Sequence, residues 1–147
     1  MLRSLPALGR RVSRPAPRLA HLAIIVRDLD AQTVVPLAAL GLAVRDRTAV
    51  PGEGVAVSFV PVGAAEVELV QPLSPGGPLG QFIDRRGEAI HHLALGVPDL
   101  EAAIGRATAA GLRFAGQAPR TGAHGTRIAF VHPSSLHGLL LELVEIP

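Results

Sequence analysis

The sequence contains no cysteine, no lysine, no tyrosine and no tryptophan. The absence of cysteine excludes disulfides, thiolate metal sites and cysteine nucleophiles, so imidazole and carboxylate groups would have to bind any metal ion. Four phenylalanines are the only aromatic residues, which leaves few rings for stacking on nucleic-acid bases. No apolar stretch reaches the roughly 20 residues that cross a bilayer, so we expect no membrane association.

The pI of about 10.9 reflects the lack of lysine and tyrosine rather than a basic surface. All 14 basic residues are arginine, and five of them lie in the first 18 residues, which contain no acid. Residues 19–147 contain nine arginines and 12 acidic residues, so this part of the chain is mildly acidic. A nucleic-acid binder needs a basic face, and we therefore expect no nucleic-acid partner.

We interpret residues 1–18 as a flexible Arg-rich extension and residues 19–147 as a single domain. The extension has the composition of an organelle transit peptide, which would place the protein in the mitochondrial matrix. Its prolines weaken a helix there, and a bacterial extension on a cytoplasmic protein is the interpretation that we favour.

A duplication organises the domain. The segment HLAIIVRDLDA at 21–31 recurs as HLALGVPDLEA at 92–102 with seven of eleven positions identical, and VELV at 67–70 recurs as LELV at 141–144. We therefore predict two βαβββ modules, at 19–73 and 90–147, joined by a linker at 74–89.

Each module shows the same series of local patterns. Each begins with a strand, at 21–26 or 92–97, followed by a helix near 30–40 or 100–110 that Asp28 or Asp99 caps. A strand at 42–47 or 112–115 and a hairpin over 55–70 or 127–144 then complete the module. A helical turn is expected at 79–86 in the linker. The fold class is α+β, with the modules forming a half-open mixed β-barrel and the helices outside.

Four polar residues occupy matched places in the repeat, namely His21 with His92 and Glu68 with Glu142. Packing about a pseudo-twofold axis would bring both imidazoles and both carboxylates to one point, where they could bind Zn, Co, Mn, Ni or Fe(II). A single histidine or glutamate in such a strand is more often a core or surface residue. An unpaired carboxylate inside a barrel is costly, however, so the repetition of both residues favours a metal site.

The other histidines show no such repetition. His91 precedes His92 in a strand and should point to the opposite face, so we take it as a neighbour rather than a ligand. His124 in the loop GAHG and His132 before Pro133 are either substrate-binding groups or turn residues.

The segments LAHLAIIVRDLD (19–30), VELVQPL (67–73), IHHLALGVPDLEAAI (90–104), GAHGTRIAFVHP (122–133) and GLLLELVE (138–145) resemble the vicinal oxygen chelate superfamily. Within it, the chain is most similar to the methylmalonyl-CoA epimerases. The resemblance implies a homodimeric isomerase of an acyl-CoA that binds a divalent metal through His21, Glu68, His92 and Glu142. Some of these epimerases have a glutamate, proposed as a base, where this chain has Val57.

We expect Glu142 and Glu68 to be the catalytic acid and base, because epimerisation needs proton transfer on both faces of one carbon. Arg120, Arg127 and His124 are candidates for substrate binding. A glyoxalase I-type lactoylglutathione lyase is the nearest alternative, since it would use the same four groups. A non-catalytic ligand-binding protein of the superfamily is the other alternative. An extradiol dioxygenase is disfavoured, because two histidines and one glutamate would suffice for its metal and Glu68 would have no role.

Overall fold

The computed structural model of the chain describes residues 16–45, 47–122 and 125–147. Residues 1–15 of the predicted extension lie outside this part of the chain. The first module consists of β1 (Arg18–Ile25), α1 (Ala31–Ala39), β2 (Thr48–Val50), β3 (Val55–Val62) and β4 (Ala65–Pro72). After α2 (Pro78–Arg86), the second consists of β5 (Ala89–Val97), α3 (Leu100–Ala109), β6 (Phe114–Thr121), β7 (Arg127–Val131) and β8 (Leu141–Glu145). The two predicted βαβββ modules are therefore confirmed.

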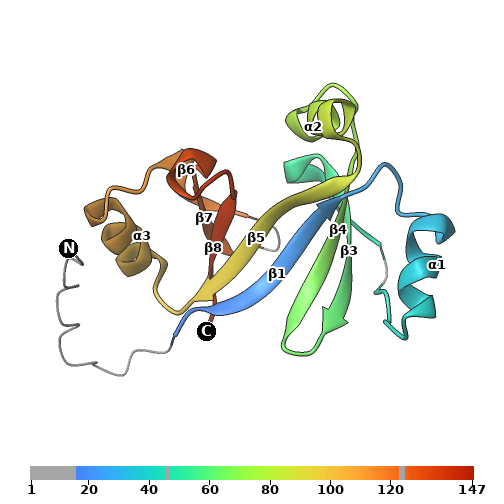
Figure 1. Ribbon diagram of the computed structural model, residues 1–147, viewed down its shortest axis with the longest axis horizontal. Helices are drawn as coiled ribbons and strands as arrows, with labels where there is room; N and C mark the ends of the chain where they lie inside the picture. The colour runs from blue at the N-terminus through green and yellow to red at the C-terminus, as the bar shows by residue number, and fades with distance from the viewer. Residues whose placement is uncertain (1–15, 46, 123–124) are drawn as a thin grey trace, which may run out of the picture.

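One mixed sheet of eight strands holds both modules, in the order β2-β3-β4-β1-β5-β8-β7-β6. The strands of the second module repeat the order of the first in reverse, so a pseudo-twofold axis passes between β1 and β5. These two strands run antiparallel through the middle of the molecule (Figure 1), and each pairs in parallel with the last strand of its own module, β4 or β8. The sheet ends at β2 and β6, which do not pair, so the predicted half-open barrel is confirmed.

Side chains on the two faces of the sheet form separate cores. The convex face packs against α1 in the first module, through Val60 and Leu69, and against α3 in the second, through Leu100 and Leu143. The concave face of the first module packs against α2. Alternation along β3 and β4 sends successive side chains to opposite faces, so every second residue of these strands is available to the concave interior.

The predicted strand at 42–47 is wrong. Residues 42–45 and 47 are not in a strand, and the short β2 follows them at Thr48–Val50. Leu42 and Val44 are partly buried against the core beneath α1, so burial under the helix explains their apolar alternation. In the second module, β6 begins at Phe114 and continues to Thr121, well past the expected end.

The predicted capping signal holds for the helix of the second module, whereas α1 begins at Ala31 and the predicted cap by Asp28 stays a prediction. The side chain of Asp99 caps α3 as predicted, because it accepts a hydrogen bond of 2.8 Å from the backbone N–H of Ala102. The expected helical turn at 79–86 is α2. Gly80 lets α2 lie close to the preceding loop, because a Cβ at this position would lie 2.2 Å from the carbonyl oxygen of Pro75. No helix in the described ranges is long and apolar enough to cross a membrane.

Candidate metal centre

Two neighbouring rows of residues across the sheet position the four predicted side chains. One row runs through Phe59 of β3, Glu68 of β4, Ala23 of β1 and His92 of β5. The next row runs through His21 of β1, Ala94 of β5, Glu142 of β8 and Phe130 of β7. The pseudo-twofold axis exchanges the rows. Residues in register on adjacent strands point to the same face, so both rows project into the concave interior. Each alanine separates a glutamate from a histidine, and its small side chain leaves room for the two to converge.

A β-bulge precedes each of the two histidines. On β1 the register shifts between Leu19 and His21, and on β5 it shifts at His91, so that Ala20 and His91 are the extra residues. A bulge changes the direction of a side chain relative to a regular strand. The expectation that His91 points away from His92 is therefore wrong: their Nδ1 atoms are 2.9 Å apart, and both side chains line the same cavity.

The structure brings all four predicted side chains together. Nε2 of His21 lies 3.1 Å from Nε2 of His92, 3.0 Å from Oε2 of Glu142 and 3.4 Å from Oε2 of Glu68. Nε2 of His92 lies 3.3 Å from Oε2 of Glu142. The donor atoms of His21, His92 and Glu142 all lie within 4.8 Å of one another, so these three residues form a group that could hold a metal ion. Glu68 adjoins this group through His21.

The spacing and burial of these atoms fit a divalent cation. Ligand atoms about 2.1 Å from an ion lie about 3.0 Å apart at octahedral angles and about 3.4 Å apart at tetrahedral angles, which is the observed range. Oε2 of Glu142 is buried and has no hydrogen-bond partner of good geometry in the described chain. A cation among these donor atoms would satisfy this oxygen in place of its ion pairs with His21 and His92. Glu68, His92 and Glu142 are 6 to 8% exposed, so water competes little at this position.

Burial and mutual contacts shift the pKa values of the four groups in different directions. Burial raises the pKa of Glu68, and the nearby His21 and His92 offset this only in part. Burial also disfavours ionised Glu142, but polar contacts with both imidazoles outweigh it and lower the pKa of Glu142 to about 2. Burial opposes protonation of His21, yet Glu142 and Glu68 raise its pKa. Burial and the adjacent His92 lower the pKa of His91 to about 4.

The four side chains lie in the wall of a cavity of about 630 Å³. Its other walls are mostly apolar, including Val57, Phe59, Ile128, Phe130 and Leu140. The sequence reasoning missed Glu53 and Glu66, two further acids of this cavity, because neither has an acidic counterpart in the second module. The alternation on β4 could have identified Glu66, which lies two residues before Glu68 and therefore on the same face.

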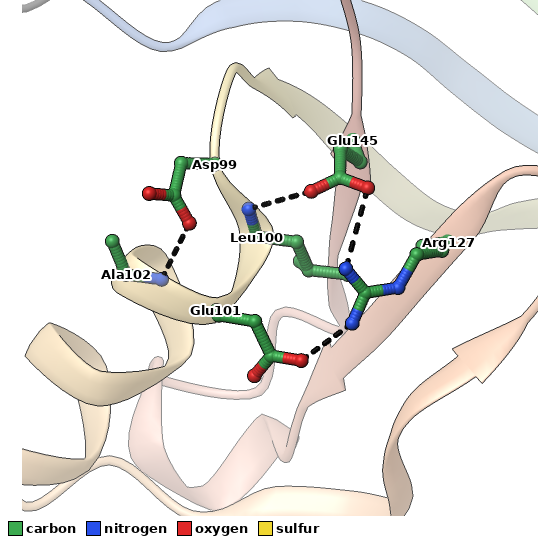
Figure 2. A network of polar contacts seen from close by, with 6 residues as sticks. All are labelled: Asp99, Leu100, Glu101, Ala102, Arg127 and Glu145. Carbon is green, nitrogen blue, oxygen red and sulfur yellow. Dashed lines mark hydrogen bonds and ion pairs between the residues drawn. The ribbon is translucent and has the colours of Figure 1, made fainter.

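Of the two arginines expected to bind substrate, only Arg120 lines the cavity, where its guanidinium lies 5.3 Å from the centre of the Phe130 ring. Arg127 is not in the cavity wall. Figure 2 shows its guanidinium between Glu101 and Glu145, while Glu145 also accepts a hydrogen bond from the backbone N–H of Leu100. Arg127 therefore joins β7 and β8 to the N-terminus of α3, and this position does not support the predicted role in substrate binding.

The remaining histidines have different outcomes. His124 lies outside the described residues. His132 acts as a turn residue, because its side chain accepts a hydrogen bond from the backbone N–H of Ser134 and caps the 3-10 helix Pro133–Ser135.

Comparisons with known proteins agree with this fold. The family model described as the glyoxalase/bleomycin resistance protein/dioxygenase superfamily matches residues 20–130. The ethylmalonyl-CoA/methylmalonyl-CoA epimerase of Cereibacter sphaeroides is 37% identical over 131 residues, which cover 88% of this chain and 98% of the relative. The mitochondrial methylmalonyl-CoA epimerase of Homo sapiens is 32% identical over 129 residues, covering 87% of this chain and 73% of the relative.

A solved structure is similar over the same region. A variant of Streptomyces coelicolor methylmalonyl-CoA epimerase, in complex with 2-nitronate-propionyl-CoA, matches with a TM-score of 0.78 and 31% identity. The match covers 87% of this chain and 93% of that protein.

Proposed function

The chain belongs to the glyoxalase/bleomycin resistance protein/dioxygenase superfamily, and we propose that it is a metal-dependent epimerase that interconverts the (R) and (S) forms of methylmalonyl-CoA. The observation that carries this proposal is the convergence of two imidazoles and two carboxylates on the wall of one cavity. The names of the relatives at 37% and 32% identity support the substrate. The complex of the Streptomyces coelicolor enzyme with an acyl-CoA analogue supports the acyl-CoA class.

We propose that His21, Glu68, His92 and Glu142 are the metal ligands. A set of two imidazoles and two carboxylates suits Co, Mn, Zn, Ni or Fe(II) and leaves coordination positions for substrate on a six-coordinate ion. When bound, the ion would supply a Lewis acid that stabilises negative charge developing on the thioester and carboxylate oxygens of the substrate.

The two glutamates would carry the proton transfer. The proton on C2 of methylmalonyl-CoA is acidified by the flanking thioester and carboxylate, so one carboxylate can remove it to give an enolate. The second glutamate then donates a proton to the opposite face of the same carbon, which inverts the centre and leaves the substrate formula unchanged. We propose that Glu142 and Glu68 act in this way, because they occupy equivalent strands on either side of the pseudo-twofold axis.

The two glutamates exchange protonation states in each conversion. The one that donates begins in its acid form and ends ionised, while the one that accepts does the reverse. Each carboxylate has two oxygens, so one oxygen can contact an ion while the other contacts the substrate proton. The pairing would reverse for the opposite direction of the reaction.

The rest of the cavity suits the remaining parts of the substrate. Apolar side chains such as Val57 and Ile128 provide a surface for the methyl group. We propose that Arg120 binds the carboxylate or a phosphate of the CoA, because it is the one arginine among the described cavity residues. A homodimer and a cytoplasmic location, or the mitochondrial matrix if residues 1–18 are a transit peptide, stay predictions.

Exchange of the C2 proton with solvent tests the proposed activity. Metal-loaded protein in D2O should incorporate deuterium at C2 of methylmalonyl-CoA, and a parallel assay should find no isomerisation of the methylglyoxal–glutathione hemithioacetal. Turnover of the hemithioacetal without exchange into methylmalonyl-CoA would favour the glyoxalase I-type lyase. A protein that binds no metal and turns over neither compound would favour the non-catalytic binder.

A further inference from the structure

The bulge before His92 differs from the bulge before His21 in one respect. The extra residue is Ala20 on β1 and His91 on β5, so only the second module places an imidazole beside a candidate ligand. Nδ1 of His91 lies 2.9 Å from Nδ1 of His92, which is hydrogen-bonding distance. Two nitrogens at this distance need one proton between them, so one ring must donate and the other accept.

The position of Nε2 of His92 decides which ring donates. This atom lies among the donor atoms of the candidate metal centre, 3.1 Å from Nε2 of His21 and 3.3 Å from Oε2 of Glu142. A neutral imidazole that presents a lone pair at Nε2 carries its proton on Nδ1. His92 must then donate its Nδ1–H to His91, and His91 must accept through its own Nδ1.

Ring packing holds this pair in place. The His91 ring lies edge-on to Phe82 of α2, with ring centres 5.1 Å apart and planes at 83°. The His92 ring lies edge-on to Phe130 of β7, with centres 5.4 Å apart and planes at 86°. Both rings therefore have neighbours that restrict rotation, and the hydrogen bond between them has a defined direction.

We propose that His91 is a positioning residue of the metal centre, which accepts the Nδ1–H of His92 and thereby fixes the tautomer and the ring orientation that direct Nε2 of His92 to the metal. This inference rests on the proposed metal ligation by His92. Partners of this kind orient metal-binding histidines, and their loss typically weakens metal affinity by roughly 10- to 100-fold. The side chain acts through His92 and needs no contact with the substrate.

The chain itself offers the matched variant, because His91→Ala gives β5 the same Ala-His pair that β1 has at Ala20 and His21. We expect His91→Ala to weaken Co(II) binding by roughly 10- to 100-fold in competition with a chelator. His91→Gln keeps an acceptor oxygen in this position and should bind Co(II) within a few-fold of the wild type. Phe82→Leu, which removes the ring packing but keeps the acceptor, should have a smaller effect than His91→Ala.

Nitrogen NMR of the zinc-loaded wild type gives a readout that simple destabilisation would not change. We expect Nδ1 of His92 to be protonated and Nδ1 of His91 to lack a proton, and the reverse assignment would overturn the inference. Equal Co(II) affinity of His91→Ala and the wild type would overturn it as well. A wild-type protein that binds no metal would instead overturn the proposed function on which the inference rests, and the two failures are therefore distinguishable.

Discussion

Replacing Glu142 with glutamine should destabilise the protein after its metal has been removed with a chelator. His21 and His92 hold the pKa of Glu142 at about 2 in the folded chain, against an ordinary value of 4.5. Because the folded pKa is the lower one, the ionised carboxylate adds stability that is present above pH 4.5 and is lost as the pH falls toward 2. This lowering of the pKa corresponds to about 3 kcal/mol. Glutamine keeps the shape of the side chain and one hydrogen-bonding oxygen, so we expect a loss of about 1–3 kcal/mol.

Glu68→Gln is the matched control, because the same substitution should have the opposite sign there. Burial raises the pKa of Glu68, so its favourable contribution is present below pH 4.5 and is lost as the pH rises through the folded pKa. The ionised group therefore costs stability near neutrality, and Glu68→Gln should leave the metal-free protein as stable as the wild type or more stable.

Urea unfolding at pH 6, followed by circular dichroism in the presence of chelator, measures both effects. At this pH Glu142 is ionised and the raised pKa of His21 keeps that imidazole protonated. We expect the free energy of unfolding to fall for Glu142→Gln alone, and the difference from the wild type to shrink below pH 4. Equal stability of Glu142→Gln and the wild type at pH 6, or equal losses in both variants, would refute the reasoning.

Three further predictions concern the metal, the cavity and α2. Co(II) at about 100 times its dissociation constant should stabilise the wild type by about 2.7 kcal/mol in thermal unfolding, and Glu142→Gln should lose most of this gain at the same concentration. Arg120→Gln should raise KM for methylmalonyl-CoA more than it lowers kcat in a coupled assay, whereas Arg127→Gln, outside the cavity, should leave KM unchanged; equal changes in KM would contradict this. Gly80→Ala should lower the melting temperature, because the new Cβ would lie 2.2 Å from the carbonyl oxygen of Pro75. Glycine to alanine in a helix ordinarily stabilises by about 1 kcal/mol, so the expected sign is the opposite of the usual one. An unchanged or raised melting temperature would contradict this prediction.

The sequence predicts that the candidate ligands converge, because residues that recur in both copies of a duplicated fold must occupy equivalent places in the two modules. Equivalent residues of two modules meet across a pseudo-twofold axis, so the repetition of His21 as His92 and of Glu68 as Glu142 implied a common centre. The register of the sheet then places each glutamate one alanine away from a histidine. Glu53 and Glu66 line the same cavity, but they have no acidic counterpart in the second module.

Features that depend on irregular backbone or on contacts distant in sequence were not predictable in this way. Strict alternation assigned His91 to the wrong face, because a bulge breaks the register of β5 and leaves no pattern in the residues themselves. The apolar alternation from Leu42 to Val44 matched a strand, although it reflects packing beneath α1. Arg127 was a candidate for substrate binding, and nothing in the sequence indicated that the fold places Glu101 and Glu145 beside it.

A crystal structure of the cobalt-loaded protein, with anomalous scattering recorded at the cobalt edge, tests the account most directly. We predict one anomalous peak between β1, β4, β5 and β8, about 2.1 Å from Nε2 of His21, Nε2 of His92 and one oxygen each of Glu68 and Glu142. A peak bound by other residues, or no peak at full cobalt loading, would contradict the account.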